Sequence, residues 1–143
     1  MSEIISGLWI GDTNISKRND FHLKNNIQYS INCENSLSYL TNITHEKLKK
    51  HNISLDSISS KMINYWIEES KKIYKNLIEF NGVLIYCNNL EKSSSLLLAY
   101  LIIYCSLNLE NSINVIRSKL DDTFYPNQVI SYALKHLHRK INL

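Results

Sequence analysis

The order of apolar patterns along the chain predicts a layered α/β or α+β fold built on a central sheet. Strand-like runs come first, at residues 8–10 and 27–33, and amphipathic helical patterns follow from residue 60 onwards. One more strand-like run lies between two helical patterns, at residues 83–87. Together with an earlier run at 52–55 it predicts a strand–helix–strand crossover in the middle of the chain.

The first half of the chain supplies most of the predicted strands. A short strand at 8–10 is bounded by Gly7 and Gly11, and residues 17–25 form a plausible short helix. Alternating polarity predicts a second strand over 27–33. Residues 37–50 fit either a helical turn or a loop, and residues 52–55 are expected to form a third strand.

The second half is dominated by helices. Apolar residues recur at helical spacing over 60–80, which predicts a long helix that covers one sheet face. A turn at 81–82 then leads into a strand over 83–87, whose apolar run is typical of a strand buried on both faces. Three further helices are expected over 94–105, over 110–120 and after Pro126, which favours the first helical turn.

Length and composition indicate one ordinary globular domain spanning residues 1–143. Hydrophobic residues make up 44% of the chain and charged residues 20%, both within the usual range for such proteins. The net charge of +3 comes with scattered rather than clustered lysines, so nucleic-acid binding is not expected. No apolar stretch is long enough to span a membrane.

The cysteines and the N-terminus predict an intracellular, cytoplasmic protein. The first residues lack the pattern of a secretory signal, and Cys33, Cys87 and Cys105 form no CxxC pair, which favours free thiols. The bias towards Asn, Ile, Lys and Ser suits an AT-rich genome, and for a viral protein the compartment would be the host cytoplasm. The five histidines show no ligand spacing, so we expect no metal and no cofactor.

Residues 83–95 hold the pattern with the clearest chemical meaning. A buried strand ends at Cys87, five residues follow, and Ser93 and Ser94 precede a helix. A strand, tight loop and helix in this order aim backbone N–H groups and the positive helix end at one point, which favours anion binding. A cysteine at the mouth of such a site would be nucleophilic. The simpler interpretation is a buried, inert thiol at a strand end.

Four segments together resemble the dual-specificity phosphatase family. Residues 7–12 are similar to its opening strand, 27–33 to its second strand, 83–100 to its signature strand, loop and helix, and 125–127 to the start of its final helix. The resemblance runs from about residue 4 to residue 137. It implies a compact domain with a central, mostly parallel sheet and helices on both sides.

The resemblance also assigns roles to residues around the loop. It places the catalytic nucleophile on Cys87 and the Ser or Thr that assists the leaving thiolate on Ser94. It places Tyr86 where the family has His, Leu90 where it has Gly, and Ser93 where it has the phosphate-binding Arg.

The general acid of the family would be an Asp in the loop after the third strand, where Asp56 is the only carboxylate. Its spacing from that strand is one residue short of the family pattern, and a solvated loop carboxylate is the simpler interpretation of Asp56. The remaining positions of the degenerate phosphate loop are Asn88, Asn89, Glu91 and Lys92.

These departures weaken phosphate binding for physical reasons. An Arg makes two parallel charged hydrogen bonds to a phosphate, which Ser93 cannot copy. Leu90 lacks the freedom of glycine to adopt positive φ, and Glu91 adds a carboxylate beside the position of a phosphate dianion.

The leading hypothesis is therefore a pseudophosphatase, an inactive phosphatase-like protein that binds a protein partner, such as a phosphoprotein. One alternative is residual Cys87-dependent phosphatase activity on a protein, an RNA 5′ end or a phosphoinositide, with Lys92 replacing part of the Arg function. Another is a purely structural homodimer.

Overall fold

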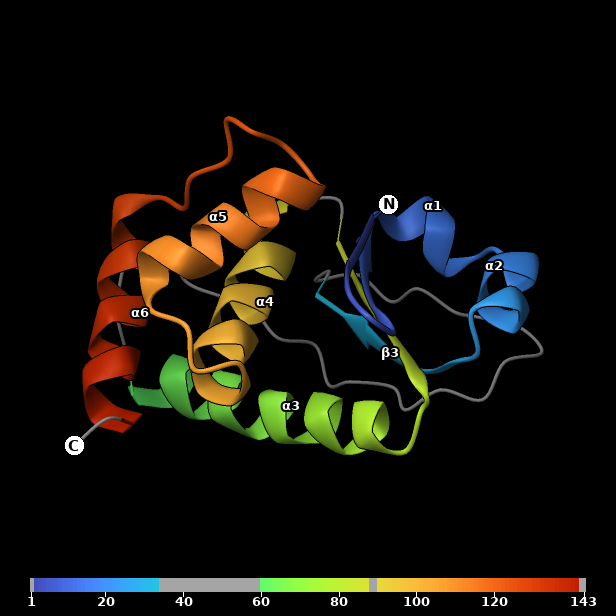
Figure 1. Ribbon diagram of the computed structural model, residues 1–143, viewed down its shortest axis with the longest axis horizontal. Coiled ribbons are helices and arrows are strands. Elements are labelled where there is room, and N and C mark those ends of the chain that lie inside the picture. The colour runs from blue at the N-terminus through green and yellow to red at the C-terminus, as the bar shows by residue number, and fades with distance from the viewer. Residues whose placement is uncertain (1, 34–59, 88–89, 142–143) are drawn as a thin grey trace.

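The computed structural model describes residues 2–33, 60–87 and 90–141, and its arrangement is that of an α/β fold (Figure 1). Within these residues the sheet has four strands in the order β1-β2-β4-β3. The strands are β1 Ser2–Ile5, β2 Leu8–Gly11, β3 Ile27–Asn32 and β4 Gly82–Tyr86. The strands β2 and β3 run parallel to β4, and only β1 is antiparallel. The expected mostly parallel sheet is confirmed.

The central strand β4 is buried along its whole length. Val83 and Ile85 face the larger apolar core, whereas Leu84 and Tyr86 face a smaller cluster on the opposite side. This division follows from the period of two in a strand, which points successive side chains to opposite faces. The continuous apolar sequence is thus explained by cover on both faces.

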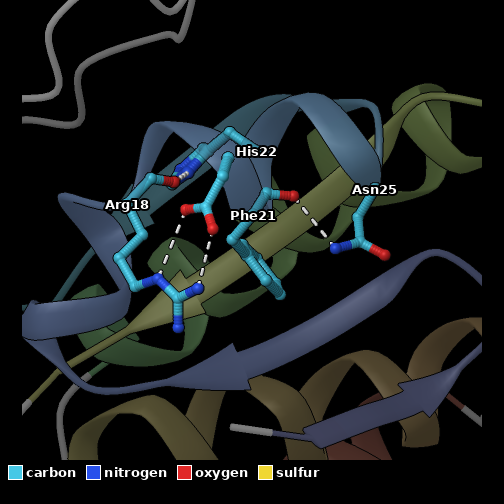
Figure 2. A network of polar contacts seen from close by, with 5 residues as sticks. Arg18, Phe21, His22 and Asn25 are labelled. Carbon is cyan, nitrogen blue, oxygen red and sulfur yellow. Dashed lines mark hydrogen bonds and ion pairs between the residues drawn. The ribbon is translucent and has the colours of Figure 1, made fainter.

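Two short helices cover one face of the sheet, α1 Thr13–Ser16 and α2 Asn19–Lys24 (Figure 1). Ile15 and Phe21 bring their side chains into the smaller cluster, where the ring of Phe21 meets Trp9 edge-on at 5.1 Å between centroids. Figure 2 shows polar contacts at both ends of α2. The carbonyl of Arg18 lies 2.7 Å from His22 Nδ1, and Asn25 Nδ2 donates to the carbonyl of Phe21 over 2.9 Å.

The other face carries the larger core and, among the described residues, four helices: α3 Ser60–Ile78, α4 Leu90–Tyr104, α5 Leu109–Lys119 and α6 Gln128–Ile141. The expected cover on both sides is therefore confirmed. Residues 96–102 of α4 are all buried, because this helix lies between α3, α5 and α6 (Figure 1). None of the helices in the described ranges is both long enough and apolar enough to cross a membrane.

Several elements differ from the sequence-based expectation. The edge strand β1 and the short helix α1 were not predicted, and the helix expected over 17–25 is confirmed as α2, which is shorter and spans Asn19–Lys24. Pro126 does not lie in the first turn of α6. Asn127 precedes that turn and caps it, since its Oδ1 accepts a hydrogen bond from the N–H of Ile130 at 2.9 Å. The segments predicted over 37–50 and 52–55 lie outside the described residues.

Gly82 at the start of β4 offers a test of this packing. A Cβ atom there would lie 2.5 Å from the carbonyl oxygen of Asn25 and 2.9 Å from Ile27 Cδ1. We expect Gly82→Ala to lower the free energy of unfolding by about 2 kcal/mol, because backbone atoms would have to shift. Urea unfolding followed by circular dichroism measures this change. The exposed helical residue Asn114 provides the control, and Asn114→Ala should change stability by less than about 0.5 kcal/mol. Equal stabilities of the two variants would contradict the close approach.

Candidate functional site

The candidate site lies where the three parallel strands end. The N–H of Cys87, directly after β4, donates to the carbonyl of Gly11 in β2 at 3.1 Å. The N–H of Cys33, directly after β3, donates to the carbonyl of Tyr86 at 3.0 Å. Cys87 is thus held at the centre of the carboxyl edge of the sheet. In open α/β folds this edge is where ligands usually bind.

The Cys87 side chain is turned into the protein. It is 3% exposed and belongs to the larger apolar core, as does Cys33. Its Sγ donates to the carbonyl oxygen of Cys33 over 3.4 Å. This hydrogen bond is open only to the protonated thiol, because a thiolate has no proton to donate. The arrangement therefore suits a packed thiol better than an exposed nucleophile.

Tyr86, at the position that the resemblance assigns to His, points to the opposite face of the sheet. Its side chain is buried in the smaller cluster with Ile15 and Phe21. Tyr86 therefore serves the packing of α1 and α2 on the sheet. Strand alternation directs it away from the side that holds Cys87.

The helix that follows begins earlier than expected. We predicted a loop through Ser93 and a helix from residue 94, whereas α4 starts at Leu90. The backbone of residues 90–93 is thus already helical, and those positions do not form an open loop. The residue types allow this result, since Leu, Glu and Lys are good helix formers.

The first turn of α4 contains Glu91 and Lys92, and of these two only the side chain of Glu91 is described. Glu91 lies in this turn, where a carboxylate is stabilised by the positive helix end, by about 0.3–1 kcal/mol. Ser93, Ser94 and Ser95 are all buried, and Ser94 Oγ donates to the carbonyl of Glu91 over 3.3 Å. At the position assigned to the phosphate-binding Arg, the chain thus has a small, buried, uncharged side chain.

Other predicted site residues remain untested. Asp56, Asn88 and Asn89 lie outside the described residues. For Leu90 and Lys92 only the helical backbone is described. The assignment of a general acid to Asp56 and of a supporting role to Lys92 both stay predictions.

A buried polar cluster next to the site was missed by the sequence analysis. Glu69 of α3 is charged, yet it is only 4% exposed. It accepts a hydrogen bond from the Tyr29 hydroxyl at 2.6 Å and pairs with Lys72 at 3.4 Å. Burial, with smaller effects from Cys33 and Glu69, raises the pKa of Tyr65. Helical periodicity alone could not identify Glu69, because its partner Tyr29 is 40 residues away.

The comparisons with known proteins support the fold. No family model matches the chain, and no curated protein matches its sequence. Solved structures match along almost the whole length, and the fold is that of the dual-specificity phosphatases. Human DUSP28 superposes with a TM-score of 0.83 at 12% identity, covering 99% of this chain and 98% of its own.

Two further solved structures have a similar fold. The human tyrosine phosphatase-like serine/threonine/tyrosine-interacting protein has a TM-score of 0.82 at 16% identity, covering 100% of this chain and 98% of its own. A leucine rich repeat and phosphatase domain containing protein from Entamoeba histolytica has a TM-score of 0.80 at 18% identity, covering 99% and 92%. At these identities the likeness establishes the fold, and the chemistry depends on the residues of this chain.

Thiol reactivity tests the placement of Cys87. We expect iodoacetamide to label the half-buried Cys105 first, although burial raises the pKa of that thiol. Cys87 and Cys33 should react at least about tenfold more slowly, because a buried thiol reacts only when the structure opens. Peptide mass spectrometry over a time course resolves the three sites, and Cys105→Ser should remove the fast phase. Labelling of Cys87 ahead of Cys105 would contradict the burial of the Cys87 thiol.

Proposed function

We propose that the protein is a pseudophosphatase, a dual-specificity phosphatase-like domain that acts by binding a protein partner without dephosphorylating it. The main support is the start of α4, where the buried Ser93 stands at the position assigned to the phosphate-binding Arg. A serine there supplies no charge to hold a phosphate dianion. Loss of a charged, bidentate clamp costs several kcal/mol in the transition state, or roughly a thousandfold in rate.

The surroundings of Cys87 support the same proposal. The thiol is buried and donates a hydrogen bond to the carbonyl of Cys33. Glu91 places a carboxylate in the first turn of α4, where a phosphate would otherwise receive the field of the helix end. Attack by Cys87 on a phosphate monoester would require the thiol to lose its proton and to become accessible.

A binding role fits a fold retained without its catalytic groups. Among the similar structures, one is described as tyrosine phosphatase-like and as an interacting protein. We propose by analogy that this chain recognises a protein partner, such as a phosphoprotein. The three free cysteines favour an intracellular setting for that interaction.

Turnover measurements test this proposal. The purified protein should hydrolyse neither a generic aryl phosphate nor phosphotyrosine peptides faster than its Cys87→Ser variant. An active dual-specificity phosphatase assayed in parallel confirms that the conditions permit catalysis. Turnover that is clearly above background and is abolished by Cys87→Ser would show a working enzyme and would overturn the proposal.

A further inference from the structure

The outer surface of α6 is hollowed along the helix. One hollow of about 660 Å³ lies near its N-terminal half and a second of about 320 Å³ near its C-terminal half. Lys135 lines both hollows, which lie one after the other along α6. In Figure 1, α6 lies against α4 and α5 on the side of the molecule away from α1 and α2. We call this surface the α5–α6 groove; its main lining residues are Leu109, Glu110, Tyr125, Tyr132, Lys135 and Arg139.

The N-terminal part of the groove presents two aromatic side chains. Tyr125 is 50% exposed and Tyr132 is 59% exposed. The ring of Tyr125 is held in place, because Arg117 Cζ lies 5.6 Å from its centroid and its hydroxyl donates to Glu110 Oε1 over 3.3 Å. Arg117 is itself fixed, since its Nε donates to the carbonyl of Phe124 at 2.7 Å. An aromatic side chain that is exposed and already ordered loses little entropy when a ligand packs on it.

The C-terminal part of the groove carries Lys135 and Arg139 together with Glu110, whose carboxylate accepts the hydrogen bond from Tyr125. α6 contains three Lys or Arg residues and no Asp or Glu, and the rest of the chain has thirteen of each sign. This helix therefore accounts for the whole net charge of +3. Basic residues in the last turn stabilise a helix through its dipole, which explains Arg139 and Lys140 without a ligand. Lys135 lies outside the last turn and lines both hollows, so the dipole does not explain its position.

Aromatic and basic residues share one face of α6. Tyr132, Lys135 and Arg139 follow at spacings of three and four residues, which places them in a row along the helix. The opposite face is buried against the core through Ile130 and Leu134. An extended segment lying along this row would meet an apolar surface first and positive charge next.

We propose that the α5–α6 groove binds an acidic linear segment of a protein partner. An apolar side chain of that segment packs between Tyr125 and Tyr132, and its carboxylates pair with Lys135 and Arg139. The chemistry follows from charge complementarity, which gives such surfaces their specificity and their association rate. The inference rests on the proposed binding function and adds to it a surface that shares no lining residue with the Cys87 site.

Fluorescence anisotropy with a defined probe tests the groove. The probe is a short labelled peptide in which glutamates flank a leucine–phenylalanine pair, and its counterpart has lysines in place of the glutamates. The full-length protein should bind the acidic peptide and not the basic one. Lys135→Glu with Arg139→Glu should weaken binding by at least about tenfold, and Tyr132→Ala by about fivefold.

The matched control reverses the same number of charges elsewhere. Lys71 and Lys75 are exposed on α3, and Lys75 is in the last turn of that helix, as Arg139 is in α6. Lys71→Glu with Lys75→Glu should leave binding of the acidic peptide within about twofold of that of the unmodified protein, because residues 71 and 75 do not line the groove. Circular dichroism verifies that every variant is folded.

Three results would overturn the inference: no binding of the acidic peptide, equal loss in the α3 and α6 variants, or self-association through α6. Sedimentation velocity detects the last of these, since a second copy in the groove would make the protein a dimer that Lys135→Glu with Arg139→Glu dissociates. The turnover assay on Cys87 is a separate measurement. An active enzyme that still binds the peptide would refute the pseudophosphatase proposal and leave the groove intact.

Discussion

The pairing of β4 with a parallel strand on each side is the constraint on which the rest of the structure depends. Its hydrogen bonds to β2 and β3 place β4 in the middle of the sheet, and cover on both faces buries all five of its residues. Val83 and Ile85 anchor the core beneath α3 and α4, while Leu84 and Tyr86 anchor the helices α1 and α2. Both layers of helices therefore take their position from one short strand.

The same strand determines the candidate site. Because Cys87 and Cys33 continue the backbone pairing beyond the strand ends, Cys87 is fixed at the carboxyl edge of the sheet. Phosphatase chemistry at such an edge needs an accessible thiolate, converging backbone donors and a positive charge. Here the thiol is buried and hydrogen-bonded, and a helical turn with Glu91 follows within a few residues. The fold is that of the dual-specificity phosphatases, and the thiol at its carboxyl edge lies in the apolar core.

The sequence predicts the parts of the fold that depend on local pattern. The continuous apolar run identifies β4 because that strand is buried along its whole length. The helical periodicity identifies α3 because it is sustained over a long segment. The strand β1 escaped prediction because four residues give too little alternation, and it is stabilised by pairing with β2. The burial of Glu69 escaped because it depends on a contact with Tyr29, which is 40 residues away in the sequence. The start of α4 at Leu90 differs from the loop that was expected there, although Leu, Glu and Lys are good helix formers.

The candidate site, like the fold, could be predicted from the sequence only in part. The identities of Cys87, Ser93 and Glu91 are read directly from the sequence, and so is the missing cationic group at residue 93. The burial of the thiol, its bond to Cys33 and the opposite orientation of Tyr86 required the structure. The basic residues of α6 are also visible in the sequence. Because lysines are scattered along the whole chain, however, the sequence does not indicate a groove at α6. Only the structure shows that Lys135 and Arg139 of α6 line a hollow together with Leu109 and Glu110 of α5.

Titration with inorganic phosphate tests most directly whether the anion site has been lost. The backbone amides of Cys87 and of Ser93, Ser94 and Ser95 report on the end of β4 and the first turns of α4. Followed by nuclear magnetic resonance in isotopically labelled protein, these signals should not move up to millimolar phosphate beyond the shifts of exposed amides elsewhere. Saturable shifts confined to these residues would show that a phosphate site persists at Cys87 and would contradict the account.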